Sequence, residues 1–158
     1  ARVHGIATAA GCQLVASCDL AVSSDDAIFA TPGVNLGLFC STPMVALSRK
    51  VSKKKAMQML LTGEPINASY AKEIGLINDY FSKSKLDTEI MKIAKIISSK
   101  SSVTLNIGKG AFYKQLEMPL DKAYKYTSKI MTENMMTSDA NEGISAFLEK
   151  RSPVWKNK

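Results

Sequence analysis

The first part of the chain alternates short apolar stretches with turn residues. This pattern predicts a few short buried strands and one helix: strands over 2–3, 20–23 and 27–30, with a helix over 10–17. Asp25 and Asp26 supply the turn between the last two strands, and Pro32 with Gly33 ends the third. The order is therefore strand, helix, strand, strand.

From residue 43 onward the apolar residues recur mainly with helical spacing. The pattern predicts three helices and a last strand: helices over 43–50, 53–61 and 68–74, and a strand over 76–81. Everything after residue 85 is predicted to be helical, with apolar residues such as Leu86, Ile90 and Ile93 on one face. We expect Asp139 to cap the last helix, because Glu142 follows three residues later as in a capping box. The fold class is α/β with a helical C-terminal part.

The composition of the chain limits the classes of protein to which it can belong. The chain has 158 residues, of which 46% are hydrophobic, so one packed domain is expected. Three cysteines without a CxxC spacing and one histidine give no metal-ligand pattern, so a reduced, metal-free, intracellular protein is predicted. No apolar run approaches the roughly 20 residues of a membrane span, and no signal or transit peptide is visible.

The net charge of +7 favours an anionic partner. Basic residues gather at Arg49, Lys50 and 53–55, but no aromatic residue lies between them to stack on bases. We therefore favour a solvated helix boundary over a nucleic-acid surface, and keep RNA binding as the minor alternative.

A run of small residues over 3–14 leads into the first predicted helix. Gly5 and Gly11 let the backbone approach a ligand closely, and a helix that opens near Ala10 aims free N–H groups at an anion. Such an arrangement can serve as an oxyanion hole. The alternative is a tight strand-to-helix crossing, in which small residues merely permit close packing.

Several further segments follow in a characteristic order and spacing: Cys18-Asp19-Leu20-Ala21-Val22, Ala27-Ile28-Phe29-Ala30-Thr31-Pro32, Gly37-Leu38, Leu61-Thr62-Gly63-Glu64-Pro65-Ile66 and Glu142-Gly143-Ile144-Ser145-Ala146-Phe147-Leu148-Glu149-Lys150-Arg151. With them the chain resembles the crotonase, or enoyl-CoA hydratase/isomerase, family over nearly its whole length. The resemblance implies part of a crotonase-like spiral with short strands over 1–85. It also implies a helical trimerisation subdomain over 86–158, in a homotrimer or hexamer. A mitochondrial protein of fatty-acid metabolism is implied, represented here by a C-terminal portion.

The resemblance also implies which residues form the acyl-CoA site. The backbone of Ala10 corresponds to one oxyanion donor, while the other comes from an earlier part of the family fold. The two carboxylates that hydratases use for acid–base catalysis correspond to Gln13 and Gly33. An amide has no basic state near neutral pH, and glycine has no side chain. We therefore expect hydratase activity to be absent or weak.

Phe147 and Lys150 correspond to family positions that contact the CoA nucleotide. A solvated lysine at a helix end is an almost equal alternative for Lys150. The CoA thioester is the expected ligand, and no separate cofactor is expected. For Cys40 we favour an inert buried thiol over a nucleophile. For His4 we favour a surface or packing histidine over a base. Two other functions stay open: another acyl-CoA reaction, such as thioester hydrolysis or decarboxylation, and an RNA- or protein-interaction module.

Overall fold

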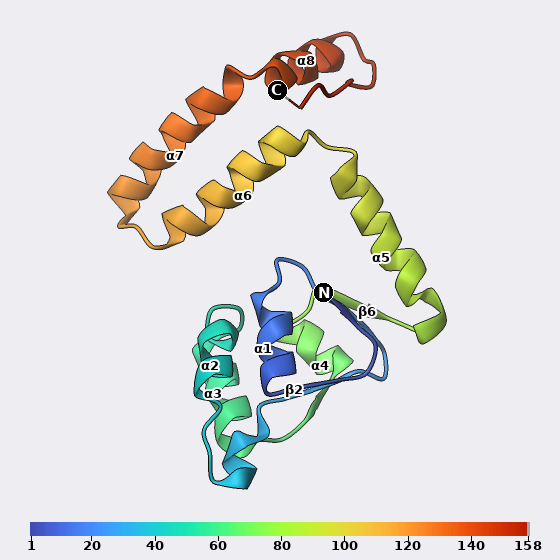
Figure 1. Cartoon of the computed structure of the whole chain (residues 1–158), viewed down its shortest axis with the longest axis vertical. Coiled ribbons are helices and arrows are strands. Elements are labelled where there is room, and N and C mark those ends of the chain that lie inside the picture. Colours follow the sequence, from blue (N-terminus) through green and yellow to red (C-terminus); the bar gives the residue numbers. More distant parts are fainter. Residues whose placement is uncertain (158) are drawn as a thin grey trace. The chain divides into compact units, whose positions relative to one another are not determined.

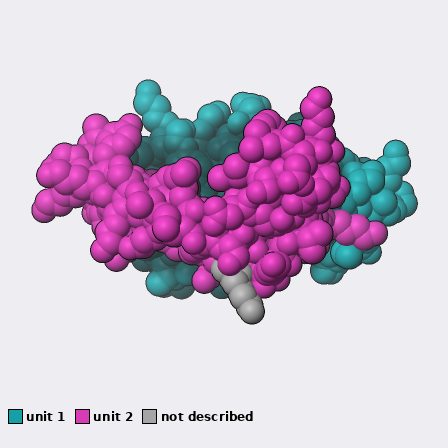
Figure 2. Space-filling view, turned by 90° about the horizontal axis from the view of Figure 1, so that it is seen from above, with its two compact units in different colours: residues 1–93 teal, residues 94–158 magenta. Residues whose placement is uncertain are grey.

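The structure is a computed structural model that describes residues 1–157. The chain divides into two compact units, the first over residues 1–93 and the second from residue 94 onward. Figure 1 shows the elements along the chain, and Figure 2 colours the two units separately. Each unit is described by itself below.

The first unit holds the six strands found within residues 1–157 and most of the shorter helices. In chain order these elements are β1 (Arg2–Val3), β2 (Ile6–Thr8), α1 (Ala10–Ser17), β3 (Val22–Ser24), β4 (Ile28–Ala30), the 3-10 helix η1 (Pro32–Leu36), α2 (Ser41–Leu47), α3 (Lys53–Thr62), β5 (Ile66–Asn67), α4 (Ala68–Glu73) and β6 (Asp79–Phe81). The division between the units falls within α5 (Lys83–Ser98). The second unit continues with α6 (Ser102–Leu116), α7 (Leu120–Met135) and α8 (Ser138–Leu148).

The strands form two small sheets. One sheet has the order β1-β3-β6 and is parallel throughout, with Val22 opposite both Arg2 and Asp79. The other has the order β2-β4-β5, in which β4 pairs parallel to β2 and antiparallel to β5. Parallel neighbours require a crossover connection, and α1 lies within both the connection from β1 to β3 and the connection from β2 to β4. The turn that follows β2 therefore opens directly into a helix.

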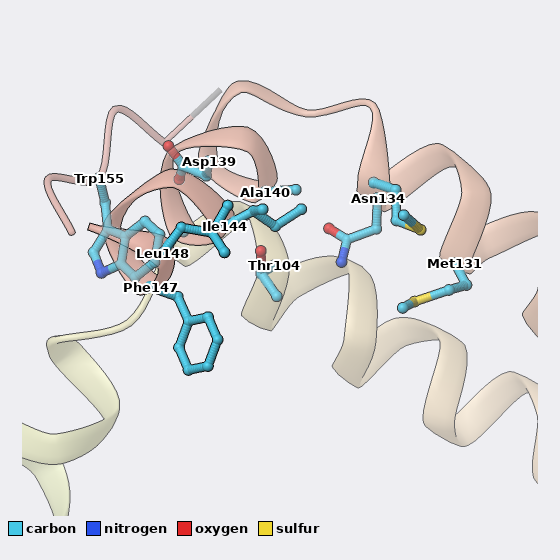
Figure 3. A pocket seen from close by; sticks show the side chains of 11 residues that line it. Thr104, Met131, Asn134, Asp139, Ala140, Ile144, Phe147, Leu148 and Trp155 are labelled. Atoms are coloured by element: carbon cyan, nitrogen blue, oxygen red, sulfur yellow. The ribbon is translucent and has the colours of Figure 1, made fainter. Parts of the chain in front are cut away.

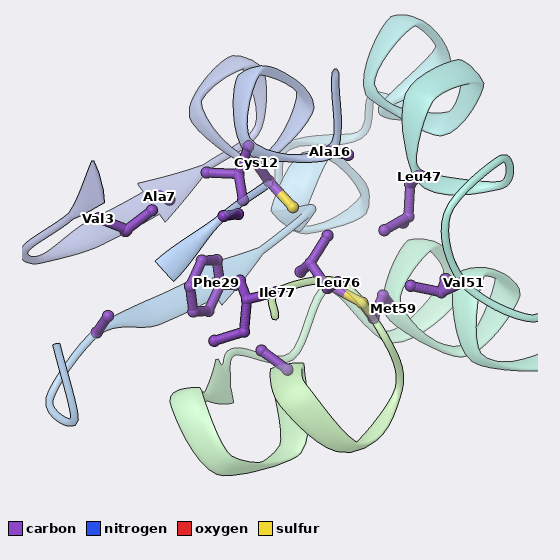
Figure 4. Close-up of a cluster of buried hydrophobic side chains, with 14 of the residues drawn as sticks. Val3, Ala7, Cys12, Ala16, Phe29, Leu47, Val51, Met59, Leu76 and Ile77 are labelled. Atoms are coloured by element: carbon purple, nitrogen blue, oxygen red, sulfur yellow. The ribbon is translucent and has the colours of Figure 1, made fainter. Parts of the chain in front are cut away.

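The core of the first unit lies between β4 and the helices around it (Figure 4). Phe29 on β4 is fully buried, with Cys12 of α1 and Leu47 of α2 in the same cluster. Ala68 and Ala71 are also fully buried, so α4 can pack closely on the strands. Burying a residue of the size of Phe29 stabilises the fold by roughly 1.5–3 kcal/mol.

Most predicted elements are confirmed, and the three elements that the pattern missed are all short. The helix over 10–17 has the expected bounds, and Asn67 caps α4 by accepting the Tyr70 N–H at 2.9 Å. The strand β2, the 3-10 helix η1 and the strand β5 were not predicted. Each spans five residues or fewer, which is too short for a hydrophobic period to show.

The predicted cap of the last helix is wrong. Thr137, not Asp139, caps α8 by accepting the Ala140 N–H at 3.2 Å. The Asp139 carboxylate is buried in the first turn and accepts the backbone N–H groups of Lys156 and Asn157 at 2.8 and 3.0 Å. The motif that resembles a capping box therefore ties the chain end to α8 instead.

Within the described range, no helix combines the length and apolar composition needed to cross a bilayer. The same residues contain no group of three or more His, Cys, Asp or Glu side chains placed to hold a metal ion.

Candidate functional site

The turn between β2 and α1 has an unusual backbone conformation. Ala9 has φ 47° and ψ −112°, a region that side chains disfavour and glycine adopts readily. Its N–H donates to the Ala30 carbonyl at 2.9 Å, which fixes the turn to the end of β4. Such a conformation costs about 1–3 kcal/mol and persists only where the surrounding structure enforces it. The peptide that carries the Ala10 N–H is thus held in a strained, fixed orientation.

The start of α1 leaves backbone donors available. The Ala9 methyl group cannot cap the helix, and within residues 1–157 the start of α1 has no side-chain cap hydrogen bond. The N–H groups of Ala10 and Gly11 precede the first intrahelical donor, which is the Gln13 N–H bonded to the Ala9 carbonyl at 3.0 Å. These donors and the helix dipole favour a negatively charged oxygen at this point.

Gln13 lies three residues after Ala10, on the same side of α1. Its side chain is half-buried, and its amide makes no hydrogen bond within residues 1–157. The neighbouring Leu14 is 68% exposed, and Phe39, just before α2, is 40% exposed. The structure thus places a neutral polar group and an exposed apolar side chain on α1, and a second exposed apolar side chain just before α2, the helix against which α1 packs.

Gly33 lies in a closed turn that has no space for a side chain. Its N–H donates to Cys40 Sγ at 3.3 Å, and its carbonyl accepts the Leu38 N–H at 3.0 Å. A Cβ atom on Gly33 would lie 2.9 Å from Cys40 Sγ and 3.1 Å from both the Cys40 nitrogen and the Leu38 carbonyl oxygen. Contacts under 3.0 Å force atoms to move. The conformation of segment 33–40 therefore requires glycine at residue 33, because Cys40 and Leu38 occupy the space that a side chain would need.

Two thiols lie in the same part of the first unit. Cys12 and Cys40 are both buried. Burial raises the pKa of Cys12 to about 11, with a smaller contribution from the nearby Cys40. The Cys40 sulfur accepts the Gly33 N–H, and no histidine contacts it among the described residues. This geometry favours the interpretation of Cys40 as a buried structural thiol.

Alkylation should distinguish the three cysteines. At pH 8 a thiol with a pKa near 11 is ionised in only about one molecule per thousand, so Cys12 should react far more slowly than the half-buried Cys18. Iodoacetamide labelling followed by peptide mass spectrometry should show Cys18 modified first, and Cys12 and Cys40 only after unfolding. Rapid labelling of Cys40 in the folded protein would revive the nucleophile hypothesis.

The end of α8 carries the other candidate residues. The Lys150 N–H donates to the Phe147 carbonyl at 3.3 Å and the Arg151 N–H to the Ala146 carbonyl at 3.0 Å, the two bonds of a Schellman turn. Glycine is usual at the left-handed position of this turn, yet Lys150 occupies it with φ 54°. The Phe147 side chain is 81% exposed. It borders a mainly apolar hollow of about 430 Å³ between α6, α7 and α8 (Figure 3).

Two backbone features of the site were not predicted from the sequence. Neither the strain at Ala9 nor that at Lys150 could be read from residue types, because both residues commonly adopt helical angles. The contact between Gly33 and Cys40 joins residues seven positions apart through a turn whose shape the pattern does not reveal. The roles of Gln13, Gly33, Phe147 and Lys150 were predicted by resemblance alone, whereas the small residues before the first helix also indicated Ala10.

The family model for enoyl-CoA hydratase/isomerase matches residues 1–158. The chain therefore belongs to this family, and its α/β architecture agrees with the fold expected from the resemblance. The crystal structure of an enoyl-CoA hydratase from Mycobacterium smegmatis aligns with 97% of the chain at a TM-score of 0.95 and 53% identity, over 60% of its own length.

Among curated proteins, the chain is 55% identical to the mitochondrial enoyl-CoA hydratase domain-containing protein 3 of Mus musculus, over 99% of this chain and 52% of that protein. It is 54% identical to the human protein of that name, also over 52% of its length. The crystal structure of the human protein aligns at a TM-score of 0.93 over 96% of this chain and 60% of that one. The chain thus spans about half the length of the curated relatives it matches. Both curated relatives are named as mitochondrial proteins, in agreement with the location that the resemblance implies.

Proposed function

We propose that the protein binds acyl-CoA thioesters in fatty-acid metabolism and has little or no enoyl-CoA hydratase activity. The observation that carries the proposal is that strained backbone conformations occur at the positions proposed to contact the ligand. Among residues 1–157, three non-glycine residues have positive φ: Ala9, Lys150 and Asn157. Ala9 immediately precedes the proposed oxyanion donor, and Lys150 is the proposed phosphate contact. Strain of this kind is concentrated at functional sites because it fixes groups that a ligand needs.

The opening of α1 suits a thioester oxygen. When a thioester is polarised or forms an enolate, negative charge develops on its carbonyl oxygen. The Ala10 N–H, held by the strained Ala9, can donate to that oxygen without reorganising. Exposed apolar side chains at Leu14, Leu38 and Phe39 offer contacts for an acyl chain.

The same site offers no side-chain acid or base at residues 13 and 33 for the addition of water. Gln13 can hold a water molecule by hydrogen bonds but cannot accept its proton. Gly33 offers only backbone atoms, and its closed turn excludes a side chain. Each general acid or base contributes roughly 100- to 10,000-fold to rate, so a site without either should hydrate slowly even if the oxyanion donor is effective.

A binding and turnover experiment tests this function. A protein with the full length of the relatives would be titrated calorimetrically with butyryl-CoA and assayed with a short 2-enoyl-CoA by loss of the conjugated thioester. Saturable binding with slow turnover supports the proposal. An ordinary hydratase rate refutes the catalytic half of it, and no binding refutes it altogether. Analysis of the products would detect thioester hydrolysis or decarboxylation.

We further propose that the helices of the second unit associate with copies of the same chain, as a homotrimer or hexamer. These helices expose large apolar side chains that are unusual on a solvated surface: Phe112, Leu116, Leu120, Tyr124 and Met136. Sedimentation equilibrium should give three or six times the chain mass. A monomer at micromolar concentration would contradict the assembly.

The substitution Lys150→Gly should separate stability from binding. Glycine adopts φ 54° without a Cβ penalty, so we expect the second unit to gain about 1 kcal/mol of stability while affinity for CoA falls. Lys150→Met is the matched control, since it removes the charge but keeps the Cβ and its strain. Thermal unfolding and calorimetric titration measure both effects. If Lys150→Gly binds CoA as well as the parent, Lys150 is a solvated lysine.

A further inference from the structure

The chain that follows α8 is held against that helix by a small set of polar contacts. The Glu142 carboxylate accepts hydrogen bonds from both terminal nitrogens of Arg151. The Oε1–Nη1 distance is 2.6 Å and the Oε2–Nη2 distance is 3.0 Å. The Glu142 Oε1 atom also accepts the Val154 N–H at 2.8 Å. One carboxylate thus fixes two points of the segment 151–157, which we name the C-terminal strap.

Other contacts hold the strap further along. The Trp155 indole N–H donates to the Ser99 carbonyl at 2.7 Å, and the indole ring lies against Gly143, where an added Cβ would come within 3.3 Å of it. The Asn157 Oδ1 atom accepts the N–H and hydroxyl of Ser102 at 3.0 and 2.7 Å. The strap is therefore tied both to α8 and to the start of α6.

Glu142 holds its contacts throughout the physiological pH range. Hydrogen bonds from Arg151 and from the Val154 N–H lower the pKa of this carboxyl to about 2. The carboxylate is ionised above its usual pKa in both the folded and unfolded states. Its stabilising contribution is therefore complete above about pH 4.5 and is lost progressively as the pH falls from there through 2.

We propose that Glu142 is a positioning residue that fixes Lys150 for recognition of a CoA phosphate, an inference that rests on the proposed function. Lys150 immediately precedes Arg151, and the two residues form the left-handed end of the Schellman turn. A bidentate contact leaves the Arg151 guanidinium little freedom to rotate. By holding Arg151 and Val154 together, Glu142 prevents the turn at Lys150 from relaxing toward an unstrained conformation.

The chain contains a matched control, because Glu149 also contacts Arg151, with Oε2 2.6 Å from Nε. Glu149 makes no bond to the strap beyond Arg151 among the described residues, and its side chain is 61% exposed. Either Glu142→Gln or Glu149→Gln removes one negative charge near Lys150. Electrostatics alone predicts that both substitutions strengthen the binding of an anion. Positioning predicts opposite outcomes: weaker binding for Glu142→Gln, and equal or stronger binding for Glu149→Gln.

Calorimetric titration with CoA and with 3′-dephospho-CoA tests the inference in a protein of the relatives' full length. We expect Glu142→Gln to weaken CoA binding about tenfold and to speed amide exchange at residues 150 and 151. Combined with Lys150→Met, it should cause no further loss of affinity, because Glu142 acts through Lys150. Glu142→Asp keeps the charge but shortens the reach, so it should also weaken binding, and it serves as the second variant if Glu142→Gln does not fold.

The outcomes separate the two proposals. If Lys150→Met binds CoA as the parent does, the proposed nucleotide contact at Lys150 is wrong. If Lys150→Met weakens binding but neither Glu142 variant does, only the positioning role is overturned. Equal gains in affinity for Glu142→Gln and Glu149→Gln would also overturn it, since they would show a simple charge effect.

Discussion

Gly33→Glu is expected to destabilise the first unit by about 1–3 kcal/mol and to leave enoyl-CoA hydration unchanged. The cost arises because the new Cβ would lie 2.9 Å from Cys40 Sγ and 3.1 Å from two backbone atoms, so the tight turn over residues 33–40 must open. Urea unfolding of the parent, Gly33→Ala and Gly33→Glu measures the effect. The alanine variant should already show most of the loss, because the conflict begins at Cβ.

The control for this prediction is Gly5→Ala in the same unit. Among the described residues no atom lies within 4 Å of a Cβ added at Gly5, so the stability of Gly5→Ala should differ from that of the parent by less than about 0.5 kcal/mol. Adding Cys40→Ala to Gly33→Ala should recover only part of the loss, since the contacts with the Cys40 nitrogen and the Leu38 oxygen stay. A Gly33→Ala variant as stable as the parent would contradict the tight turn.

Gln13→Glu, by contrast, is expected to raise the hydration rate of a short 2-enoyl-CoA by about 100-fold. This is the lower end of the contribution of a positioned general base, and only one of two carboxylates is restored. The side chain at residue 13 is half-buried, makes no hydrogen bond among the described residues, and lies on the same side of α1 as the Ala10 N–H. A carboxylate can therefore replace the amide without breaking a contact.

Ser17→Glu is the control for the Gln13 prediction. It places a carboxylate one turn further along α1, at an exposed position beyond reach of the oxyanion donor, and should leave the rate unchanged. The assay follows loss of the conjugated thioester in a protein of the relatives' full length. If the parent already turns over at an ordinary hydratase rate, a residue other than Gln13 or Gly33 supplies the base.

These two predictions differ because the two candidate positions differ in their tolerance of a carboxylate side chain. Gln13 is a neutral side chain in a place that accepts a carboxylate, whereas Gly33 belongs to a turn that depends on its missing side chain. Restoring hydration at the first position alone would leave the site without the second carboxylate. We therefore expect any engineered hydratase on this scaffold to stay well below an ordinary one.

The sequence predicted elements well where they were long or clearly bounded. The bounds of α1 and the end of α3 at Gly63 followed from small residues, capping and turn chemistry. The sequence failed at β2 and β5, whose pairing depends on the distant strand β4. It also failed at Asp139, where a local capping motif was outweighed by hydrogen bonds to residues 17 and 18 positions later. Short-range sequence patterns do not reveal partners that are distant along the chain.

By itself the sequence determined the family, the α/β class and the identity of each residue at the candidate positions. These follow from residue order, from periodicity and from the presence or absence of an ionisable group, none of which needs coordinates. Only the tertiary structure decided what these residues can do. The Ala30 carbonyl holds Ala9 in a strained turn, Cys40 closes the space at Gly33, and Glu142 fixes the chain beside Lys150. Each effect depends on atoms brought together by folding.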